Sequence, residues 1–70
     1  MDELQRIYDS EFNVSLSWFW DGGIDLTLGD PLNGIVATGT VRTMADVVPW
    51  LQTQIRTHFP ACAYARSLSA

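Results

Sequence analysis

The chain has 70 residues, with eight Asp or Glu against four Arg and no Lys, a formal net charge of −4 and one cysteine, Cys62. This length predicts a single small globular domain over residues 1–70. The longest apolar runs are far shorter than the roughly 20 residues of a membrane span, and the acidic start lacks the basic region of a signal peptide, so we expect a cytoplasmic protein without a membrane partner. A lone cysteine excludes an internal disulfide.

The charges divide unevenly along the chain. Residues 1–35 carry seven acids and one Arg, a net −6, whereas residues 36–70 carry one acid and three Arg, a net +2, which together give −4. Nucleic-acid affinity depends on cationic side chains that displace counterions from phosphates. An acidic surface of this kind therefore predicts no nucleic-acid partner.

Residues 2–9 predict a short helix. Leu4, Ile7 and Tyr8 recur at helical spacing as one apolar stripe, and acidic residues gather near the N-terminal end, where the helix dipole favours them. Two turns are too short to be stable alone. We therefore expect this stripe to pack against the rest of the domain.

Two alternating segments follow and predict an antiparallel hairpin. Residues 12–20 and 24–28 alternate apolar and polar side chains, as half-buried strands do. A two-residue Gly22-Gly23 loop would mix the faces, whereas a three-residue loop over 21–23 keeps them apart. The predicted pairs are Trp20 with Ile24, Trp18 with Leu26, and Leu16 with Leu28. Both tryptophans then belong to the core.

A third strand is predicted over residues 35–41, after a segment at 29–34 that is dense in turn residues. Its alternating pattern matches a third antiparallel strand of a meander. The predicted pairs are Leu28 with Ile35 and Ile24 with Gly39. The missing side chain of Gly39 then leaves room beside Trp20.

A helix is predicted over residues 44–59, where apolar side chains recur at helical spacing after a capping-box pattern, Thr43 to Asp46. Pro49 interrupts this range, so we expect a kink or a separate first turn there. Pro60 ends the helix. The tail over 61–70 has no strong period, and we expect its end to fray.

These elements predict an α+β fold: a small α-β-β-β-α domain with a three-stranded antiparallel meander and helices packed on one face. Element order and size resemble the double-stranded RNA-binding domain. The resemblance is one of topology alone, because that family begins its second helix with a lysine cluster, whereas this chain has Thr43-Met44-Ala45-Asp46 with Arg42 as the one nearby cation. We interpret it as shared architecture, which does not carry function.

The residues offer little for catalysis. His58 and Cys62 flank Pro60 and lack a third group to orient them, so we expect helix-dipole complementation from His58 and a small apolar role for Cys62. One His and one Cys fall short of a zinc site. Three acids near the turns, Asp21, Asp25 and Asp30, match no calcium-loop spacing. We therefore predict no catalytic residue, no metal and no cofactor.

Surface aromatic and apolar residues are the candidate interface. Phe19 points to the face opposite the core, together with Ser15 and Val36, and we expect no helix to cover that face. Trp50 lies off the apolar stripe of its helix, and tryptophan is enriched at interface hot spots. Ser15, Phe19, Val36 and Trp50 are thus the predicted interface residues.

Two functions are favoured on this reading, and a third, an enzyme that uses His58 and Cys62 or the acids near the turns, ranks below them. The first is a non-catalytic protein–protein interaction or accessory module that forms a homodimer through its sheet. The alternative is a small acidic inhibitor, related to phage or defence proteins, that occupies the basic groove of a nucleic-acid enzyme. An inhibitor should present its acids as one contiguous patch, whereas a dimerising module should present an uncovered apolar surface.

Overall fold

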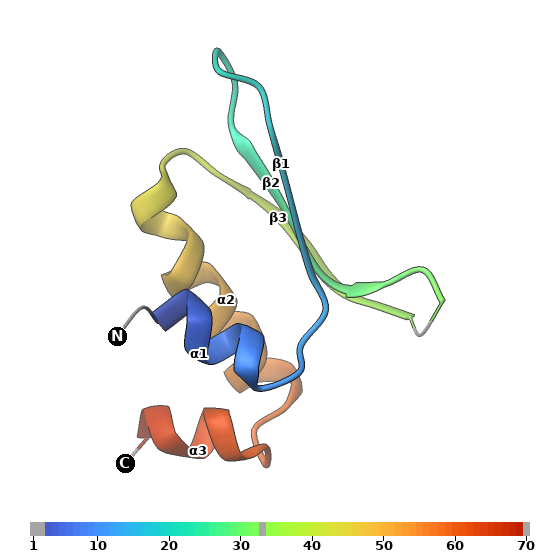
Figure 1. Ribbon diagram of the computed structural model, residues 1–70, viewed down its shortest axis with the longest axis vertical. Coiled ribbons are helices and arrows are strands. Elements are labelled where there is room, and N and C mark those ends of the chain that lie inside the picture. Colours follow the sequence, from blue (N-terminus) through green and yellow to red (C-terminus); the bar gives the residue numbers. More distant parts are fainter. Residues whose placement is uncertain (1–2, 33, 70) are drawn as a thin grey trace.

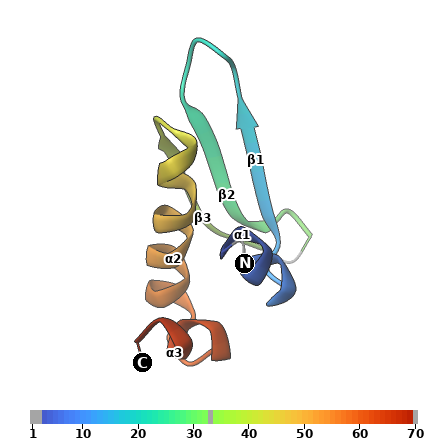
Figure 2. The same ribbon diagram turned by 60° about the vertical axis from the view of Figure 1, so that its left-hand side comes forward.

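The computed structural model describes residues 3–32 and 34–69. The three strands form one antiparallel sheet in the order β1-β2-β3, and the helices lie on one side of it (Figures 1 and 2). The elements in chain order are α1 (Glu3–Asp9), β1 (Val14–Trp18), β2 (Ile24–Asp30), β3 (Gly34–Val41), the 3-10 turn η1 (Met44–Asp46), α2 (Val47–His58) and α3 (Ala63–Ser69). The predicted α+β meander with helices on one face is confirmed.

The core lies between β2 and α2. Leu26 and Leu28 alternate along β2 and are each 1% exposed, and Leu51 and Ile55, one helical turn apart on α2, are fully buried. Ile7 of α1 completes this set at 1% exposure. A single layer of helix over a three-stranded sheet therefore holds the domain together.

The first strand is shorter than predicted, and its register is different. β1 ends at Trp18, which lies opposite Ile24, so Leu16 lies opposite Leu26. The connection is five residues long, and its turn is closed by the Gly22 N–H, which donates to the Phe19 carbonyl oxygen at 3.0 Å. The predicted register was two residues out, a shift that keeps every side chain on its predicted face.

Consequently, the prediction that both hairpin tryptophans belong to the core was wrong. Trp18 is 56% exposed and Trp20 is 93% exposed. Both hairpin loops extend beyond the layer of helices in Figures 1 and 2. Because α2 has 12 residues and is about 18 Å long, its cover does not reach the tip of the first hairpin.

The second hairpin also differs from its prediction. Leu28 lies opposite Ala37 and Gly29 lies opposite Ile35, which leaves Val36 as the extra residue of a β-bulge. Gly29 has φ +101 there, a conformation that favours glycine. The bulge exchanges the predicted faces of two residues: Ile35 is 55% exposed, and Val36 packs against the core. The turn residue Asn33 lies outside the described residues.

The cleft above Gly39 is filled by a residue other than the predicted one. Gly39 lies opposite Leu26, not Ile24, and the ring of Trp50 occupies the space that a side chain at 39 would need. A Cβ built on Gly39 would be 2.6 Å from Trp50 Nε1. The glycine thus makes room for Trp50 of α2 rather than for Trp20.

The long helical segment begins with the separate first turn that Pro49 predicted. The turn η1 spans Met44–Asp46, and α2 starts at Val47, so Pro49 falls in the first helical turn, where its missing N–H needs no intrahelical acceptor. The Thr43 hydroxyl bonds to the Asp46 carboxylate at 3.0 Å but caps no backbone N–H. As predicted, the helix ends before Pro60.

The terminal segments pack against each other. Within the predicted range 2–9, α1 starts at Glu3, and residue 2 lies outside the described residues. The predicted stripe was partly wrong, because Tyr8 is 75% exposed. The tail is not frayed up to Ser69 but forms α3, in which Tyr64 and Ala65 are buried. The tail lacks a regular apolar period, so its helix is stabilised by the burial of these two side chains against the rest of the domain.

Candidate protein interface

One edge of the sheet is formed by β1, and its backbone direction follows from one hydrogen bond. The Gly29 N–H donates to the carbonyl oxygen of Asn13, the residue opposite it, at 2.7 Å. Hydrogen-bonded and non-hydrogen-bonded pairs alternate along an antiparallel ladder. The backbone groups of Ser15 and Ser17 therefore bond to β2, whereas those of Val14, Leu16 and Trp18 point toward the free edge.

This edge carries none of the features that normally block strand pairing. Charged side chains, prolines and bulges protect most exposed edges, and β1 reads Val-Ser-Leu-Ser-Trp. Its outward side chains, Ser15 and Ser17, are small and exposed on the helix-free face. Asp25 of β2 lies next to Ser17 on the same face, and its carboxylate accepts a hydrogen bond from the Thr40 hydroxyl at 3.0 Å.

The loop that continues β1 is strongly aromatic and exposed. Phe19 is 75% exposed, and it stands between Trp18 and Trp20, which are exposed as well. Exposed contiguous apolar groups of this size mark interaction surfaces more often than they occur as neutral surface. The residues that the sequence prediction missed are thus the two tryptophans, and their signal was the run of three aromatic residues next to a glycine turn.

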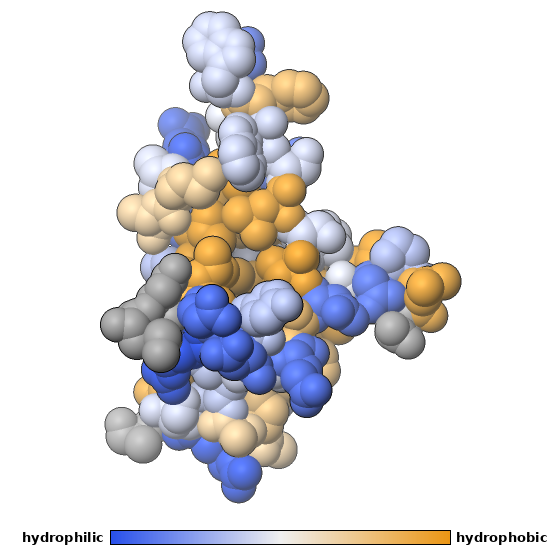
Figure 3. All heavy atoms as spheres, viewed as in Figure 1, coloured by the Kyte–Doolittle hydropathy of each residue, from blue (hydrophilic) through white to orange (hydrophobic). Residues whose placement is uncertain are grey.

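An apolar area lies between the β1 edge and the helices. Figure 3, viewed with β1 in front of the other strands, shows hydrophobic residues gathered in the middle of the molecule, between α2 and the strands. Val14 and Leu16 are half-buried members of this side of the sheet. The helix layer therefore leaves the apolar row of β1 incompletely covered.

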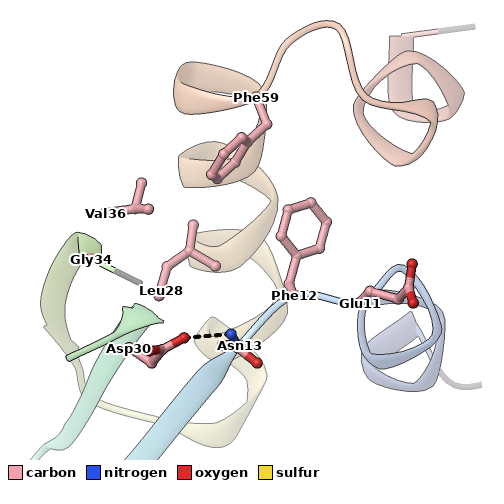
Figure 4. Close-up of a pocket in the computed structure, with 9 residues that line it drawn as sticks. Glu11, Phe12, Asn13, Leu28, Asp30, Gly34, Val36 and Phe59 are labelled. Carbon is pink, nitrogen blue, oxygen red and sulfur yellow. Dashed lines mark hydrogen bonds between the residues drawn. The ribbon is translucent and has the colours of Figure 1, made fainter. Parts of the chain in front are cut away.

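Two adjoining hollows lie at the start of β1. The smaller one, about 360 Å³, has the rings of Phe12 and Phe59 on one side, with centroids 5.5 Å apart, and Asn13 hydrogen-bonded to Asp30 at its rim (Figure 4). The larger one, about 630 Å³, straddles the strand edge. Its lining comprises Tyr8, Phe12, Asn13, Val14, Ser15, Gly29, Asp30, Pro31 and Leu32. Both are open, and their apolar walls suit another side chain.

The four predicted interface residues separate into two pairs. Ser15 and Phe19 lie at the β1 edge and in its loop, and both are exposed. Val36 is half-buried on the helix side, where it lines the smaller hollow, and not on the helix-free face as predicted. Trp50 is half-buried over Gly39. The fold therefore brings together only the first pair.

The groups weighed for catalysis have local structural contacts. The Cys62 Sγ accepts a hydrogen bond from the Ala65 N–H at 3.3 Å, which satisfies one of the first N–H groups of α3. His58 is the exposed last residue of α2. Within residues 3–32 and 34–69, no three His, Cys, Asp or Glu side chains lie close enough to hold a metal ion. None of the described helices is long and apolar enough to cross a membrane.

One polar network connects the two terminal helices away from the β1 edge. The Tyr64 hydroxyl donates to Glu3 Oε2 at 2.6 Å, and this bond, more than the neighbouring Arg6, holds the pKa of Glu3 below its usual value. Burial, and secondly the bond to Glu3, raise the pKa of Tyr64. Arg6 also donates to Ser67 at 3.0 Å. The network attaches α1 to α3.

The acidic side chains are spread over several elements. Asp21 lies in the loop before β2, and Asp30 is the last residue of β2. The seven residues of this strand span about 23 Å. Asp46 lies in η1, and Asp9 ends α1, where Gln5 donates to it at 3.0 Å. Glu11 and Asp30 both line the smaller hollow, whereas Asp21, Asp25 and Asp46 lie elsewhere in the fold, so the described acids are only partly clustered.

Comparison of the chain with models of known protein families, with curated proteins and with solved structures gives no match.

Proposed function

We propose that this chain is a non-catalytic protein–protein interaction or accessory module that works as a homodimer. The observation that carries the proposal is the exposed aromatic run Trp18–Trp20 at the end of an uncharged edge strand. Aromatic side chains supply most of the energy of interface hot spots, and an unblocked strand edge is a template for pairing. A small domain also gains from association, because its own core supplies only a few kcal/mol.

The competing hypothesis, an acidic inhibitor of a nucleic-acid enzyme, has less support. Such an inhibitor needs a concentrated field of carboxylates to enter a basic groove. Here Asp21 lies in the loop before β2 and Asp30 is the last residue of β2, a strand of about 23 Å, and Asp25 is hydrogen-bonded to Thr40. The exposed apolar surface at the β1 edge therefore supports the homodimeric module more than the inhibitor.

Sedimentation at micromolar concentration tests the proposal. We expect about twice the monomer mass of 7.8 kDa and a shift toward monomer in Phe19→Glu, because the added charge would be buried at the interface. The matched control is Ile35→Glu, which adds the same charge at an exposed apolar position on β3, away from the β1 edge. A wild-type monomer at high concentration, or equal loss of dimer in both variants, would contradict the proposed homodimer.

A further inference from the structure

We infer that two copies pair antiparallel along the free edges of β1, in a register centred on Leu16, and that the Phe19–Trp20 loop of each copy lies in the hollow at the start of the other copy's β1. The inference rests on the proposed homodimer and specifies its geometry. It yields a continuous six-stranded sheet with a two-fold axis through Leu16, so both copies use the same surface.

Hydrogen-bond geometry restricts the possible registers. The backbone groups of Val14, Leu16 and Trp18 point to the free edge, so one of these residues must lie opposite another of them in an antiparallel pair. Registers shifted by one residue would set them against Ser15 or Ser17, whose backbone groups already bond to β2. The remaining registers differ by steps of two, and centring on Leu16 pairs the most residues.

The side chains of β1 are self-complementary in this register. Val14 of each copy lies opposite Trp18 of the other, and the two Leu16 residues lie opposite each other. The incompletely covered apolar side chains of β1 therefore form one continuous surface across the interface. On the other face, Ser15 lies opposite Ser17 of the second copy, where two hydroxyls fit without a clash of charges. No other partner needs to be assumed for either face.

The position of the larger hollow matches the loop that would enter it. One residue beyond the strand, the register sets Phe19 of one copy beside Asn13 of the other, and the turn that begins there holds Trp20 on the side of Phe12. Phe12 and Asn13 both line the 630 Å³ hollow at the start of β1. Tyr8 and Leu32, which are 75% and 95% exposed, stand at its walls and would be covered by the incoming rings.

The aromatic loop alone offers about half of the area that a standard dimer interface buries. Standard interfaces bury about 800 Å² of each partner, roughly one sixth of this chain's 4948 Å² surface. At the exposures observed, the side chains of Trp18, Phe19 and Trp20 offer about 450 Å² per copy, since an aromatic side chain presents roughly 150–250 Å². The receiving hollow and the strand edge would supply the remaining area of a standard interface, roughly 350 Å² per copy.

The opposite edge, β3, is a weaker candidate for the same role. Its positions toward the helix layer are Val36, Ala37, Gly39 and Val41, which are half-buried, and Trp50 already covers Gly39. Pairing there would bury little additional apolar surface and would leave the aromatic loop exposed. The geometry therefore favours β1.

Cysteine cross-linking reads the register directly. In a Cys62→Ser background, chains with Ser15→Cys and chains with Ser17→Cys are mixed and oxidised, and we expect the mixed 15–17 disulfide to form at least about tenfold faster than either symmetric one. A non-hydrogen-bonded pair brings its Cα atoms to about 4.5 Å, whereas a diagonal neighbour is about 7–8 Å away. Thr38→Cys and Thr40→Cys, exposed on β3, are the matched controls and should not cross-link.

Each outcome of that experiment separates the inference from the proposed function. Faster 15–15 or 17–17 cross-linking, or cross-linking through β3, would overturn the register while leaving a homodimer. A dimer in sedimentation that forms none of these cross-links would overturn pairing through β1. A monomer at high concentration would overturn the proposed homodimer itself, and with it this geometry.

Charge reversal provides an independent test. In this arrangement the loop that carries Asp21 in one copy faces the segment that carries Glu11 in the other, which sets like charges at both ends of the interface. We expect Asp21→Arg to lower the dimer dissociation constant about five- to tenfold at low salt, because two repulsive contacts become attractive. Asp46→Arg, in η1, changes the net charge equally and should have a smaller effect. Combining Asp21→Arg with Glu11→Arg should cancel the gain, and equal effects of all three would refute the contact.

Discussion

Replacement of Gly39 with alanine tests how α2 is seated on the sheet. Gly39 has an ordinary strand conformation, so the backbone alone would favour alanine by roughly 0.5–1 kcal/mol. The new Cβ, however, would be 2.6 Å from Trp50 Nε1 and 2.8 Å from two ring carbons. Inserting a group into such a contact costs about 1–3 kcal/mol, because the ring must leave its position. The net expectation is a loss of about 0.5–2 kcal/mol in the free energy of unfolding.

A double-mutant cycle identifies the contact responsible. Urea unfolding followed by circular dichroism gives the free energy of each variant. In a Trp50→Leu background the ring is gone, so Gly39→Ala should become neutral or stabilising by up to about 1 kcal/mol. In a Trp20→Leu background it should remain destabilising, because Trp20 lies in the exposed loop. Stabilisation by Gly39→Ala in the wild-type background, or relief by Trp20→Leu, would refute this packing.

Three further expectations concern the core and the helix-to-helix network. Leu51→Ala should cost about 2–5 kcal/mol, close to the whole stability of such a domain, whereas Met44→Ala, at an exposed site away from the β1 edge, should change the urea midpoint little. The pKa of Glu3 is lowered in the fold, so its contribution is present above the ordinary value of 4.5 and is lost as the pH falls below it. Tyr64→Phe removes the main cause, so the midpoint should then fall less on acidification, and an unchanged acid dependence would refute this assignment. The pKa of Tyr64 is raised, so its contribution holds below pH 10.0 and is lost as the pH rises further, a loss that Tyr64→Phe should abolish.

The sequence alone was sufficient to predict the three strands, the first helix and the long helix, with most of their faces. Alternation with a period of two marks strands, and the glycine and proline turns separate them, so three strands and a meander followed directly. Pro60 predicted the end of the long helix, and Pro49 predicted a kink or a separate first turn; the structure has the separate turn. These features are local, because they depend on side chains within one or two turns of the chain.

The sequence pattern did not determine the registers. A shift of two residues preserves every face, so alternation permits both the predicted pairing of Trp18 with Leu26 and the observed pairing with Ile24. The bulge at Gly29 likewise exchanged Ile35 and Val36 between faces without a change in composition. The register of the strands depends on which side chains of the sheet are buried by a helix.

The candidate site depended on that same tertiary decision. Phe19 and Ser15 were accessible to sequence reasoning, whereas the exposure of Trp18 and Trp20 was not, since apolar side chains on the inner face of a strand are ordinarily buried. Whether an inner-face tryptophan is covered depends on the length and position of α2, which lies more than 20 residues further along the chain. A helix of about 18 Å covers the centre of the sheet and leaves its aromatic end free, because burial is set by the area of the opposing layer and not by the pattern of the strand.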